Sequence, residues 1–437
     1  MKSKSMVIVI IIALILGVAG IIYVKKDEIF IKVNTYRGVV ISKIDNKYKI
    51  KINDTIYELN EDDFKNLHME DEIEFYYENE LEEEFDIMKM RDYKVLTTND
   101  DDDIFGEYIR VSKDELFLMN QDEKIAQLLL VRYPDYNGAN IQSKYQFGGY
   151  IFFARDFNYK TKNDVIEMIS SSQKVSKIPM LIAVDEEGGN VVRVSSNKSL
   201  VSERFKSPQE LYRLGGFSKI KEDTINKSNV LKELGINLNL APVVDISENR
   251  YDYMYNRTIG LDYLGTGEYA KTVIEASKGL GVSYTLKHFP GYGNNLDTHK
   301  GISVDNRSFE EIDVSMYPFK EGIDHGAEAV MVSHNIINSV DKNLPASLSP
   351  SIHKLLRENF NFKGIIITDD LVMQALDNIG NKNVKAILAD NDLLITTNYE
   401  ESMKEIKKAL DNGELTEDMI DTHVLRILAW KHYKGLI

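Results

Sequence analysis

The chain of 437 residues contains no cysteine. Disulfides, thiolate metal ligands and cysteine nucleophiles are therefore excluded, and any chemistry must come from carboxylates, histidines, hydroxyls or lysines. Basic residues are fewer than acidic ones: the chain has 53 Lys and Arg and 69 Asp and Glu, which gives a formal net charge of −16. Such a surface repels a phosphate backbone, so we expect no nucleic-acid partner. The glycine-rich nucleotide motifs GxGxxG and GxxxxGK[ST] and the zinc motif HExxH are also missing.

One long apolar run stands near the N-terminus. From Met6 to Val24 it carries no charge, is flanked by lysines on both sides, and is about as long as a helix that spans a bilayer. We interpret residues 1–28 as an uncleaved single-pass membrane anchor, with the rest of the chain outside the cell. The alternatives are a cleaved signal peptide, which would make the protein secreted, and a buried core helix.

Residues 29–98 alternate apolar and polar side chains between short polar breaks, as in RGVVISKI and DTIYELN. Alternation with period two is typical of antiparallel strands, so we predict a small β-barrel or sandwich. Both a structural spacer and a module that binds cell wall, sugar or protein fit this pattern. The acidic segment 99–107 follows, and its adjacent aspartates predict a solvated linker.

In residues 108–437 short apolar strands alternate with amphipathic helices. Strands such as PMLIAVD, EAVMVSH and GIIITDD are apolar almost throughout, and SMKEIKKALDNG has helical periodicity. Near-continuous apolar strands separated by helices predict an α/β fold with a parallel sheet covered on both faces. Seven such strands, with an eighth near LLLVRY, favour a (β/α)8 barrel of the TIM type over an open doubly wound sheet.

Ionisable residues follow five of the predicted strands. In a (β/α)8 barrel the carboxyl ends of the strands meet at one rim, where catalytic groups lie. The residues at these positions are Asp185, Glu186, Asp245, Lys287, His288, His334, Asp369 and Asp370. Helix caps or hydrogen-bonded core histidines would explain single members of this set. Five polar strand ends at one rim instead indicate an active site.

The stretch KHFPGYGNNLDTH, residues 287–299, combines turn-forming residues with two histidines. Asp297 and His299 are two apart, so in an extended loop the carboxylate can accept the imidazole N–H. Such a bond fixes the tautomer of the histidine for general acid–base chemistry. An ordinary loop hydrogen bond is the simpler alternative. A metal site of His288, Asp297 and His299 is the other, and the missing zinc spacing disfavours it.

The same stretch resembles the KHFPGHG…D[ST]H signature of glycoside hydrolase family 3, in its β-N-acetylhexosaminidase branch. Four further stretches agree in the same order: VDEEGGNVVR, NLAPVVDI, NRTIG and PASLSPSIHKLLRENFNFKGIIITDDLVM. The resemblance covers about residues 108–437. It departs at Tyr292, where the signature often has histidine, and in the loop from Gly293 to Asp297, which is one residue shorter than in many relatives.

The resemblance implies roles for individual residues. Asp369 corresponds to the carboxylate nucleophile that forms a glycosyl-enzyme, His299 to the general acid/base, and Asp297 to the carboxylate that orients it. The family residues that hold the terminal sugar correspond in this chain to Asp185, Arg193, Arg257, Lys287 and His288. No cofactor and no metal are implied.

The implied activity is that of a retaining exo-β-N-acetylglucosaminidase, a hydrolase that acts on terminal β-linked GlcNAc. Peptidoglycan fragments of the cell wall are the expected substrates, and the anchor would hold the enzyme at the cell membrane with its catalytic domain outside. The alternatives are a β-glucosidase or a GlcNAc phosphorylase of the same family, or a non-catalytic sugar-binding protein of the cell surface.

Overall fold

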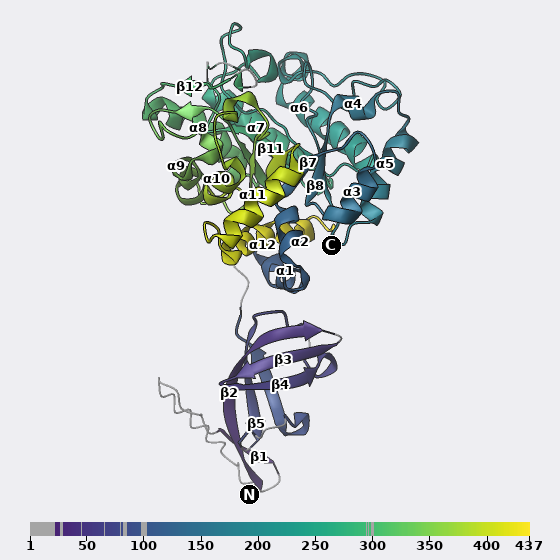
Figure 1. Cartoon of the computed structure of the whole chain (residues 1–437). Coiled ribbons are helices and arrows are strands. Elements are labelled where there is room, and N and C mark those ends of the chain that lie inside the picture. The colour runs from purple at the N-terminus through teal and green to yellow at the C-terminus, as the bar shows by residue number, and fades with distance from the viewer. Residues whose placement is uncertain are drawn as a thin grey trace, which may run out of the picture. The chain divides into compact units, whose positions relative to one another are not determined.

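The structure is a computed structural model, and it describes residues 22–26, 29–44, 46–64, 66–78, 80–81, 85–97, 103–293, 295, 297–298 and 301–437. The chain forms two compact units, Met1–Asp101 with Gly106–Leu118, and Asp102–Phe105 with Met119–Ile437. Figure 1 shows the elements of both. Each unit has its own core and is described by itself.

The first unit contains a six-stranded antiparallel sheet. Its strands are β1 (Ile22–Lys26), β2 (Ile29–Ile44), β3 (Lys47–Ile52), β4 (Thr55–Asn60), β5 (Glu72–Glu78) and β6 (Met90–Val95). The order is β4-β3-β2-β5-β6, with β1 paired to β2. In β3, exposed lysines alternate with buried Tyr48, Ile50 and Ile52, which pack with Phe64 and Phe75 into one core. The predicted antiparallel strands are confirmed, and they form one sheet.

The predicted membrane helix lies outside the described residues, except for Ile22–Val24 at its end. These residues are part of strand β1, whose backbone pairs with β2, so the helical prediction is wrong for them. In the part of the chain that the structure describes, every helix is too short or too polar to cross a membrane.

Helix α1 (Gly106–Leu118) belongs to the first unit, whereas the sequence boundaries place most of it in the barrel domain. Arg110 forms a two-point ion pair with buried Asp71, at 3.0 and 2.8 Å. Asp114 accepts a hydrogen bond from the backbone N–H of Met69 at 2.8 Å and pairs with Lys43 at 3.0 Å. Bidentate arginine–carboxylate pairs are among the stronger polar contacts in proteins, and they fix α1 against the loop before β5.

The second unit is built on eight strands that pair in parallel throughout. They are β7 (Leu129–Arg132), β8 (Gly149–Phe152), β9 (Leu181–Val184), β10 (Leu238–Asn239), β11 (Ser283–Phe289), β13 (Ala329–Val332), β15 (Ile365–Thr368) and β16 (Leu394–Thr396). β16 pairs with β7, and a bridge between Ile367 and Leu393 joins the two remaining edges. The predicted α/β fold with a parallel barrel is confirmed.

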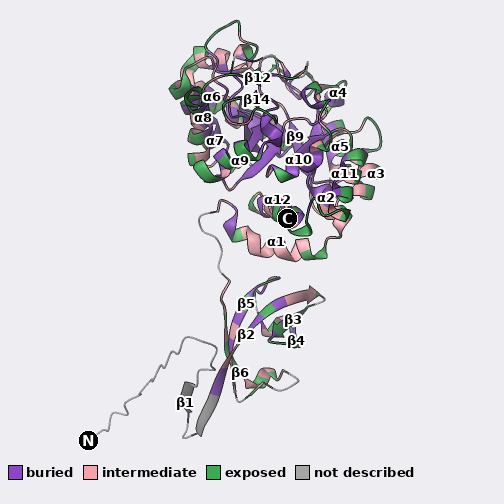
Figure 2. Ribbon diagram, turned by 60° about the vertical axis from the view of Figure 1, so that its left-hand side comes forward, coloured by how far each residue is buried: buried purple, intermediate pink, exposed green. Residues whose placement is uncertain are grey.

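Helices surround this barrel, and Figure 2 shows buried strands inside a ring of helices with exposed outer faces. They are α2 (Gln121–Gln127), α3 (Gly138–Tyr145), α4 (Ala154–Phe157), α5 (Lys162–Lys174), α6 (Pro208–Glu233), α7 (Tyr263–Ser277), α8 (Phe309–Asp324), α9 (Pro350–Lys354), α10 (Lys382–Leu388), α11 (Tyr399–Asp411) and α12 (Glu417–Tyr433). Strands such as β9 and β15 are buried on both faces, which explains their continuous apolar sequences. A short parallel pair, β12 (Val304–Asp305) and β14 (Ile336–Ile337), lies apart from the barrel sheet.

Local sequence sets where these helices begin and end. Ser308 starts α8 by accepting the N–H of Glu311, whose side chain bonds back to the N–H of Ser308, a capping box. The helix predicted in SMKEIKKALDNG is confirmed as α11, and Gly413 follows it with a φ of 76° that suits glycine.

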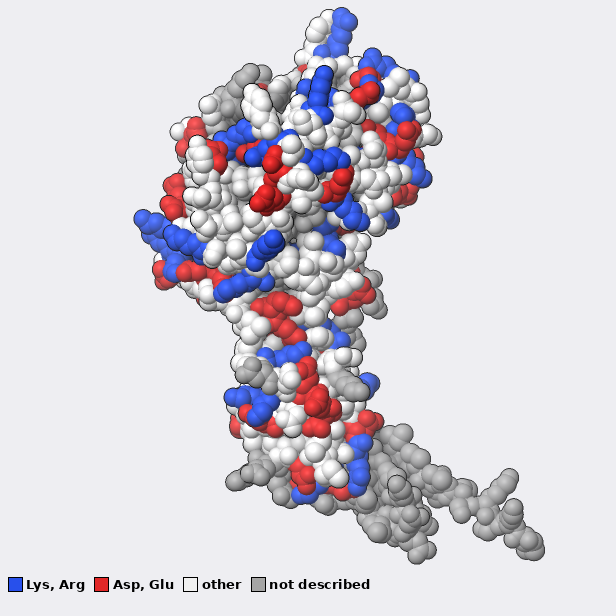
Figure 3. Space-filling model, turned by 90° about the vertical axis from the view of Figure 1, so that its right-hand side faces the viewer, with Lys and Arg blue, Asp and Glu red and all other residues white. Residues whose placement is uncertain are grey.

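On the face shown in Figure 3, the described residues carry acidic and basic side chains interspersed. The expectation that the protein binds no nucleic acid stays a prediction.

A buried carboxylate, Asp392, ties together the end of the barrel where β16 begins. It lies 2.7 Å from Arg357 Nη2 and 2.9 Å from His423 Nδ1, and it also pairs with Arg426. It further accepts the backbone N–H of Ile366 at 2.8 Å. Burial opposes the ionisation of Asp392, but the charges of Arg426 and Arg357 outweigh it and hold the pKa of the carboxyl well below its usual range.

Replacing Asp392 by Asn should lower the free energy of unfolding of the barrel by about 3 kcal/mol, because two arginines then lose their buried counter-charge. The single tryptophan, Trp430, is buried in this unit and reports its unfolding in urea by fluorescence. Asp390→Asn is the matched control, since this neighbouring side chain is 38% exposed, and its loss should cost less than about 1 kcal/mol. Equal effects of the two variants would contradict this account.

Candidate active site

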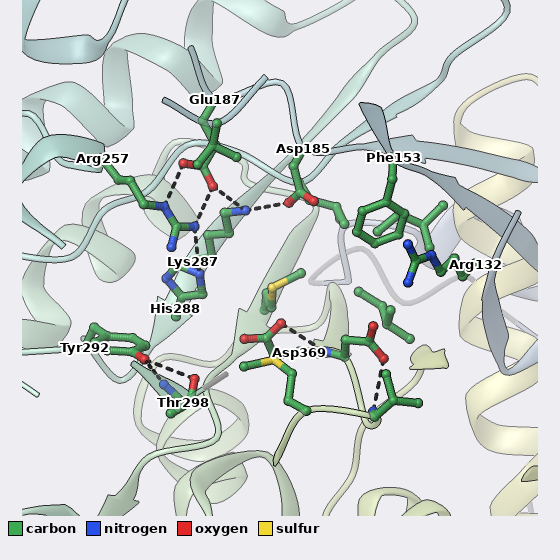
Figure 4. A pocket seen from close by; sticks show the side chains of 18 of the residues that line it. Arg132, Phe153, Asp185, Glu187, Arg257, Lys287, His288, Tyr292, Thr298 and Asp369 are labelled. Carbon is green, nitrogen blue, oxygen red and sulfur yellow. Dashed lines mark hydrogen bonds and ion pairs between the residues drawn. The ribbon is translucent and has the colours of Figure 1, made fainter. Parts of the chain in front are cut away.

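A cavity of about 480 Å³ opens at the carboxyl ends of the barrel strands. Figure 4 shows the side chains around it, which come from the ends of β7, β8, β9, β11 and β15 and from the short helix η3 (Tyr255–Arg257). The lining includes Arg132, Phe153, Asp185, Glu187, Arg193, Tyr253, Arg257, Lys287, His288, Tyr292, Thr298, Asp369 and Asp370. Six predicted site residues therefore meet in one place: Asp185, Arg193, Arg257, Lys287, His288 and Asp369.

A chain of alternating charges forms one wall of the cavity (Figure 4). Lys287, only 2% exposed, lies 2.7 Å from Asp185 and 2.8 Å from Glu187. Arg257 binds both oxygens of Glu187, at 2.6 and 3.0 Å, and Arg193 lies 3.1 Å from Asp185. Each buried charge thus has a partner of opposite sign, without which its burial would be strongly unfavourable.

These pairings keep both carboxylates ionised. Burial alone would raise the pKa of Asp185 and of Glu187, because it removes water from the charged form. The charges of Lys287 and Arg193 hold the pKa of Asp185 well below its usual range. The charges of Arg257 and Lys287 lower that of Glu187 to about 2. The wall therefore presents fixed acceptors and fixed donors side by side at neutral pH.

Glu187 is a residue of the cavity wall that the sequence analysis did not identify. Its neighbour Glu186 points elsewhere, because its carboxylate accepts the backbone N–H groups of Arg193 and Val194, each at 2.7 Å. Side chains at i and i+2 of an extended segment lie on the same side. Glu187 therefore faces the cavity with Asp185, and this spacing was the signal that could have identified it.

His288 is held by a buried aspartate, Asp245. The Nδ1 of His288 lies 2.8 Å from Asp245 Oδ2, while Asp245 Oδ1 accepts the N–H of Tyr292 at 2.8 Å. Nε2 of His288 lies 3.5 Å from Arg257 Nη2, on the side of the cavity. Asp245 is one of the rim residues that the sequence indicates. Its contacts are those of an orienting residue, since it is fully buried and outside the lining.

Asp369 follows β15 and lies between the two sides of the cavity (Figure 4). Its Oδ1 accepts the N–H of Asp370 at 2.8 Å, which fixes the carboxylate orientation. Asp370 also lines the cavity, and its Oδ1 accepts the N–H of Val372 at 3.1 Å. Burial raises the pKa of Asp370 to about 6, and the charge of Asp369 adds to this effect. Asp370 therefore takes up a proton at a higher pH than an ordinary aspartate does.

His334, another candidate from the sequence, is a buried support for this region. Its Nδ1 lies 2.7 Å from Ser347 Oγ, and its Nε2 lies 3.0 Å from the carbonyl oxygen of Asp370. It is 1% exposed and is not part of the cavity lining. The alternative of a core histidine with satisfied hydrogen bonds is the one that fits these contacts.

The loop after β11 is fastened by Tyr292. Its hydroxyl accepts the backbone N–H of Thr298 at 2.8 Å and lies 3.0 Å from Thr298 Oγ1. Next to Thr298, the carboxylate of Asp297 accepts a hydrogen bond from the hydroxyl of Tyr253. His299 lies outside the described residues, so its bond to Asp297 stays a prediction. Tyr292, which replaces the usual histidine of the family signature, thus holds the segment that leads into the predicted acid/base.

Among the residues that the structure describes, one group of side chains has the spacing of metal ligands: Asp390, Asp392 and His423. It lies at the amino ends of the strands, away from the cavity. Arg357 and Arg426 already bind its carboxylates, and these cations would compete with a metal ion. We assign this group a structural role.

The comparisons with known proteins agree with this geometry. The N-terminal domain of glycosyl hydrolase family 3 matches residues 120–430, and the chain therefore belongs to glycosyl hydrolase family 3. It is 31% identical over 277 residues to a β-hexosaminidase of Methylobacillus flagellatus, an overlap of 59% of this chain and 76% of that protein. It is 27% identical over 329 residues to the β-hexosaminidase LpqI of Mycobacterium tuberculosis, an overlap of 72% and 83%.

Solved structures give the same result. A family 3 β-N-acetylglucosaminidase from Paenibacillus sp. FPU-7 is 27% identical, with a TM-score of 0.68 over 73% of this chain and 63% of that chain. A β-glucoside phosphorylase, BglX, is also 27% identical, with a TM-score of 0.67 over 76% of this chain and 61% of that chain. The family resemblance inferred from the sequence is confirmed.

The variant Tyr292→Phe should loosen the loop, because the N–H of Thr298 loses its acceptor. One hydrogen bond contributes about 1 kcal/mol, so amide hydrogen exchange in residues 293–301 should quicken several-fold, as mass spectrometry of the full chain would measure. Tyr251→Phe is the control, since Tyr251 is 79% exposed, and exchange there should not change. Unaltered exchange in Tyr292→Phe would show that the hydroxyl does not hold the loop.

Proposed function

We propose that the protein is a retaining exo-β-N-acetylglucosaminidase that hydrolyses terminal β-linked GlcNAc. The observation that carries the proposal is the position of Asp369, a carboxylate that faces a cavity with a wall of fixed donors and acceptors. The names of the relatives support it, since they include β-hexosaminidases and a family 3 β-N-acetylglucosaminidase.

The charged wall suits a neutral sugar with several hydroxyls. Asp185 can accept hydrogen bonds from hydroxyl groups, while Lys287 and Arg193 can donate hydrogen bonds to hydroxyl or amide oxygens. These side chains are already fixed by one another, so the sugar does not have to order them on binding. A cavity of about 480 Å³ lies within the usual range for small-molecule sites.

The reaction proceeds in two displacements. In the first, Asp369 attacks the anomeric carbon, the bond to the leaving oxygen breaks, and protonated His299 gives its proton to that oxygen. In the second, neutral His299 takes a proton from water, the water oxygen attacks the anomeric carbon, and the bond to Asp369 breaks. Two inversions give net retention. Asp297 orients His299 and stabilises its charged form.

The membrane location and the natural substrate form part of the same proposal. The uncharged run that begins at Met6 and precedes strand β1 supports a single-pass anchor, with residues 29–437 outside the cell, or a secreted protein if the segment is cleaved. Peptidoglycan fragments would then supply the terminal β-linked GlcNAc. Neither a metal nor an organic cofactor is required by these steps.

Phosphorolysis is the second candidate, and the likeness to the β-glucoside phosphorylase BglX supports it. A neutral histidine repels incoming phosphate less than a carboxylate does, so phosphate could replace water in the second displacement. Product analysis separates the two reactions. A hydrolase releases free GlcNAc at the same rate with and without phosphate, whereas a phosphorylase forms the sugar 1-phosphate.

Asp369→Ala should abolish the glycosyl-enzyme and lower kcat at least about a thousandfold, because the nucleophile is lost. The measurement is the intact mass of the full chain after incubation with an aryl β-GlcNAc that turns over slowly. Asp370→Asn is the matched control. It should keep the covalent adduct, since Asp370 is adjacent to Asp369 in the chain but does not form the bond to the sugar. A sugar adduct on the Asp369→Ala protein would refute the assignment.

His299→Ala should separate substrates by their leaving groups. General acid catalysis contributes about a hundredfold or more when the leaving oxygen needs a proton, and little when it leaves as a stable phenolate. The first displacement should therefore slow strongly for alkyl β-GlcNAc and only slightly for dinitrophenyl β-GlcNAc, as pre-steady-state kinetics would measure. Asp297→Asn should give the same pattern more weakly. An equal loss on both substrates would argue against an acid role for His299.

A further inference from the structure

Arg132 is a cation in the cavity that the proposed reaction does not use. It is the last residue of β7 and lines the cavity, with its guanidinium 4.4 Å from the centroid of the Phe153 ring. Among the residues that the structure describes, its side chain has neither an ion pair nor a hydrogen bond. Its Nε is buried and has no acceptor. Lys287 and Arg257, by contrast, are each paired with a carboxylate.

Arg193 shares this feature in part. Its guanidinium lies 5.4 Å from the centroid of the same Phe153 ring, and one of its nitrogens binds Asp185. Its Nε, like that of Arg132, is buried without an acceptor. Two arginines with unused donors therefore border one aromatic ring. Buried donors without partners are unfavourable, so the pair is suited to a ligand that supplies the missing acceptors.

The charge of Arg132 acts on two carboxylates of the protein, Asp156 and Asp370. Asp156 already pairs with Arg155 and accepts the N–H of Phe153, whereas Asp370 lines the same cavity. The charge of Arg132 acts on Asp370, but the two side chains form no ion pair. The carboxylate of Asp370 instead accepts the N–H of Val372. The positive charge of Arg132 is therefore left for a bound molecule.

The position of Arg132 indicates which part of a substrate would meet it. In Figure 4, Arg132 and Phe153 lie on one side of the cavity, Tyr292 and Thr298 lie on the other, and Asp369 lies between them. Arg193, which borders the same Phe153 ring as Arg132, corresponds to a residue that holds the terminal sugar in the family signature. The side of Arg132 is therefore the side that faces the terminal sugar.

We propose that Arg132, together with Arg193, binds an anionic substituent on the terminal sugar of the substrate: a carboxylate, a sulfate or a phosphate. This inference rests on the proposed glycosidase function and names the class of sugar that the site prefers. The planar guanidinium presents two donors to such an anion, and the Phe153 ring fixes its plane. A neutral GlcNAc offers hydroxyl oxygens to these donors but no negative charge to pair with Arg132.

The test compares binding of free sugars to the full chain in mild detergent by titration calorimetry. The probes are GlcNAc, GlcNAc 6-sulfate, GlcNAc 6-phosphate and N-acetylmuramic acid, which carries a carboxylate on its C3 ether. We expect at least one anionic probe to bind about tenfold more tightly than GlcNAc, and the identity of that probe distinguishes the three anions. Arg132→Gln should remove this advantage.

Arg155→Gln is the matched control, because Arg155 follows β8 but lies outside the cavity lining and pairs with Asp135. This variant should keep the preference for the anionic sugar. The inference is overturned if no anionic probe binds more tightly than GlcNAc, or if the advantage survives in Arg132→Gln.

Hydrolysis of a neutral aryl β-GlcNAc, measured on the same preparations, separates this inference from the proposed function. Hydrolysis without any preference for an anionic sugar would refute the anion site alone. A preference for an anionic sugar without hydrolysis of any β-linked GlcNAc derivative would refute the glycosidase and leave the binding site standing.

Discussion

The rest of the site depends on the ion pairs that the buried ammonium of Lys287 forms. A lysine that is 2% exposed must be neutralised by carboxylates within direct reach, and Asp185 and Glu187 supply them at 2.7 and 2.8 Å. Glu187 in turn binds Arg257, so residues after three different strands are fixed to one another. Removal of Asp185 would leave Arg193 without its carboxylate, and removal of Glu187 would do the same to Arg257. The charges that would hold a sugar are therefore also the charges that hold the rim together.

The two sides of the cavity differ in the contacts that hold their side chains. The charged wall is fixed, which suits recognition of hydroxyl groups. The side with Tyr292 and Thr298 leads into the predicted proton donor, and there the hydroxyl groups of two tyrosines bind Thr298 and Asp297. Asp369 lies between them, at the end of a strand buried on both faces. This division matches a reaction in which the sugar stays in place while protons move on the opposite side.

Much of the fold and most of the cavity could be predicted from the sequence, because both follow local rules. Strands buried on two faces are apolar throughout, and the ends of parallel strands share one rim. Asp185, Lys287 and Asp369 were identified in this way. What the sequence did not reveal depends on contacts between distant segments. Helix α1 joins the first unit through Arg110 and Asp71. Arg132 is exceptional only because none of the described side chains forms an ion pair or a hydrogen bond with it.

The central claim is that the protein cleaves terminal β-linked GlcNAc through a covalent intermediate on Asp369, with retention of configuration. The most direct measurement is proton NMR of the sugar first released from an aryl β-GlcNAc, recorded before the anomers interconvert. The account predicts that the β-anomer appears first and the α-anomer follows by mutarotation. Initial release of the α-anomer would show a single inverting displacement and would contradict the account.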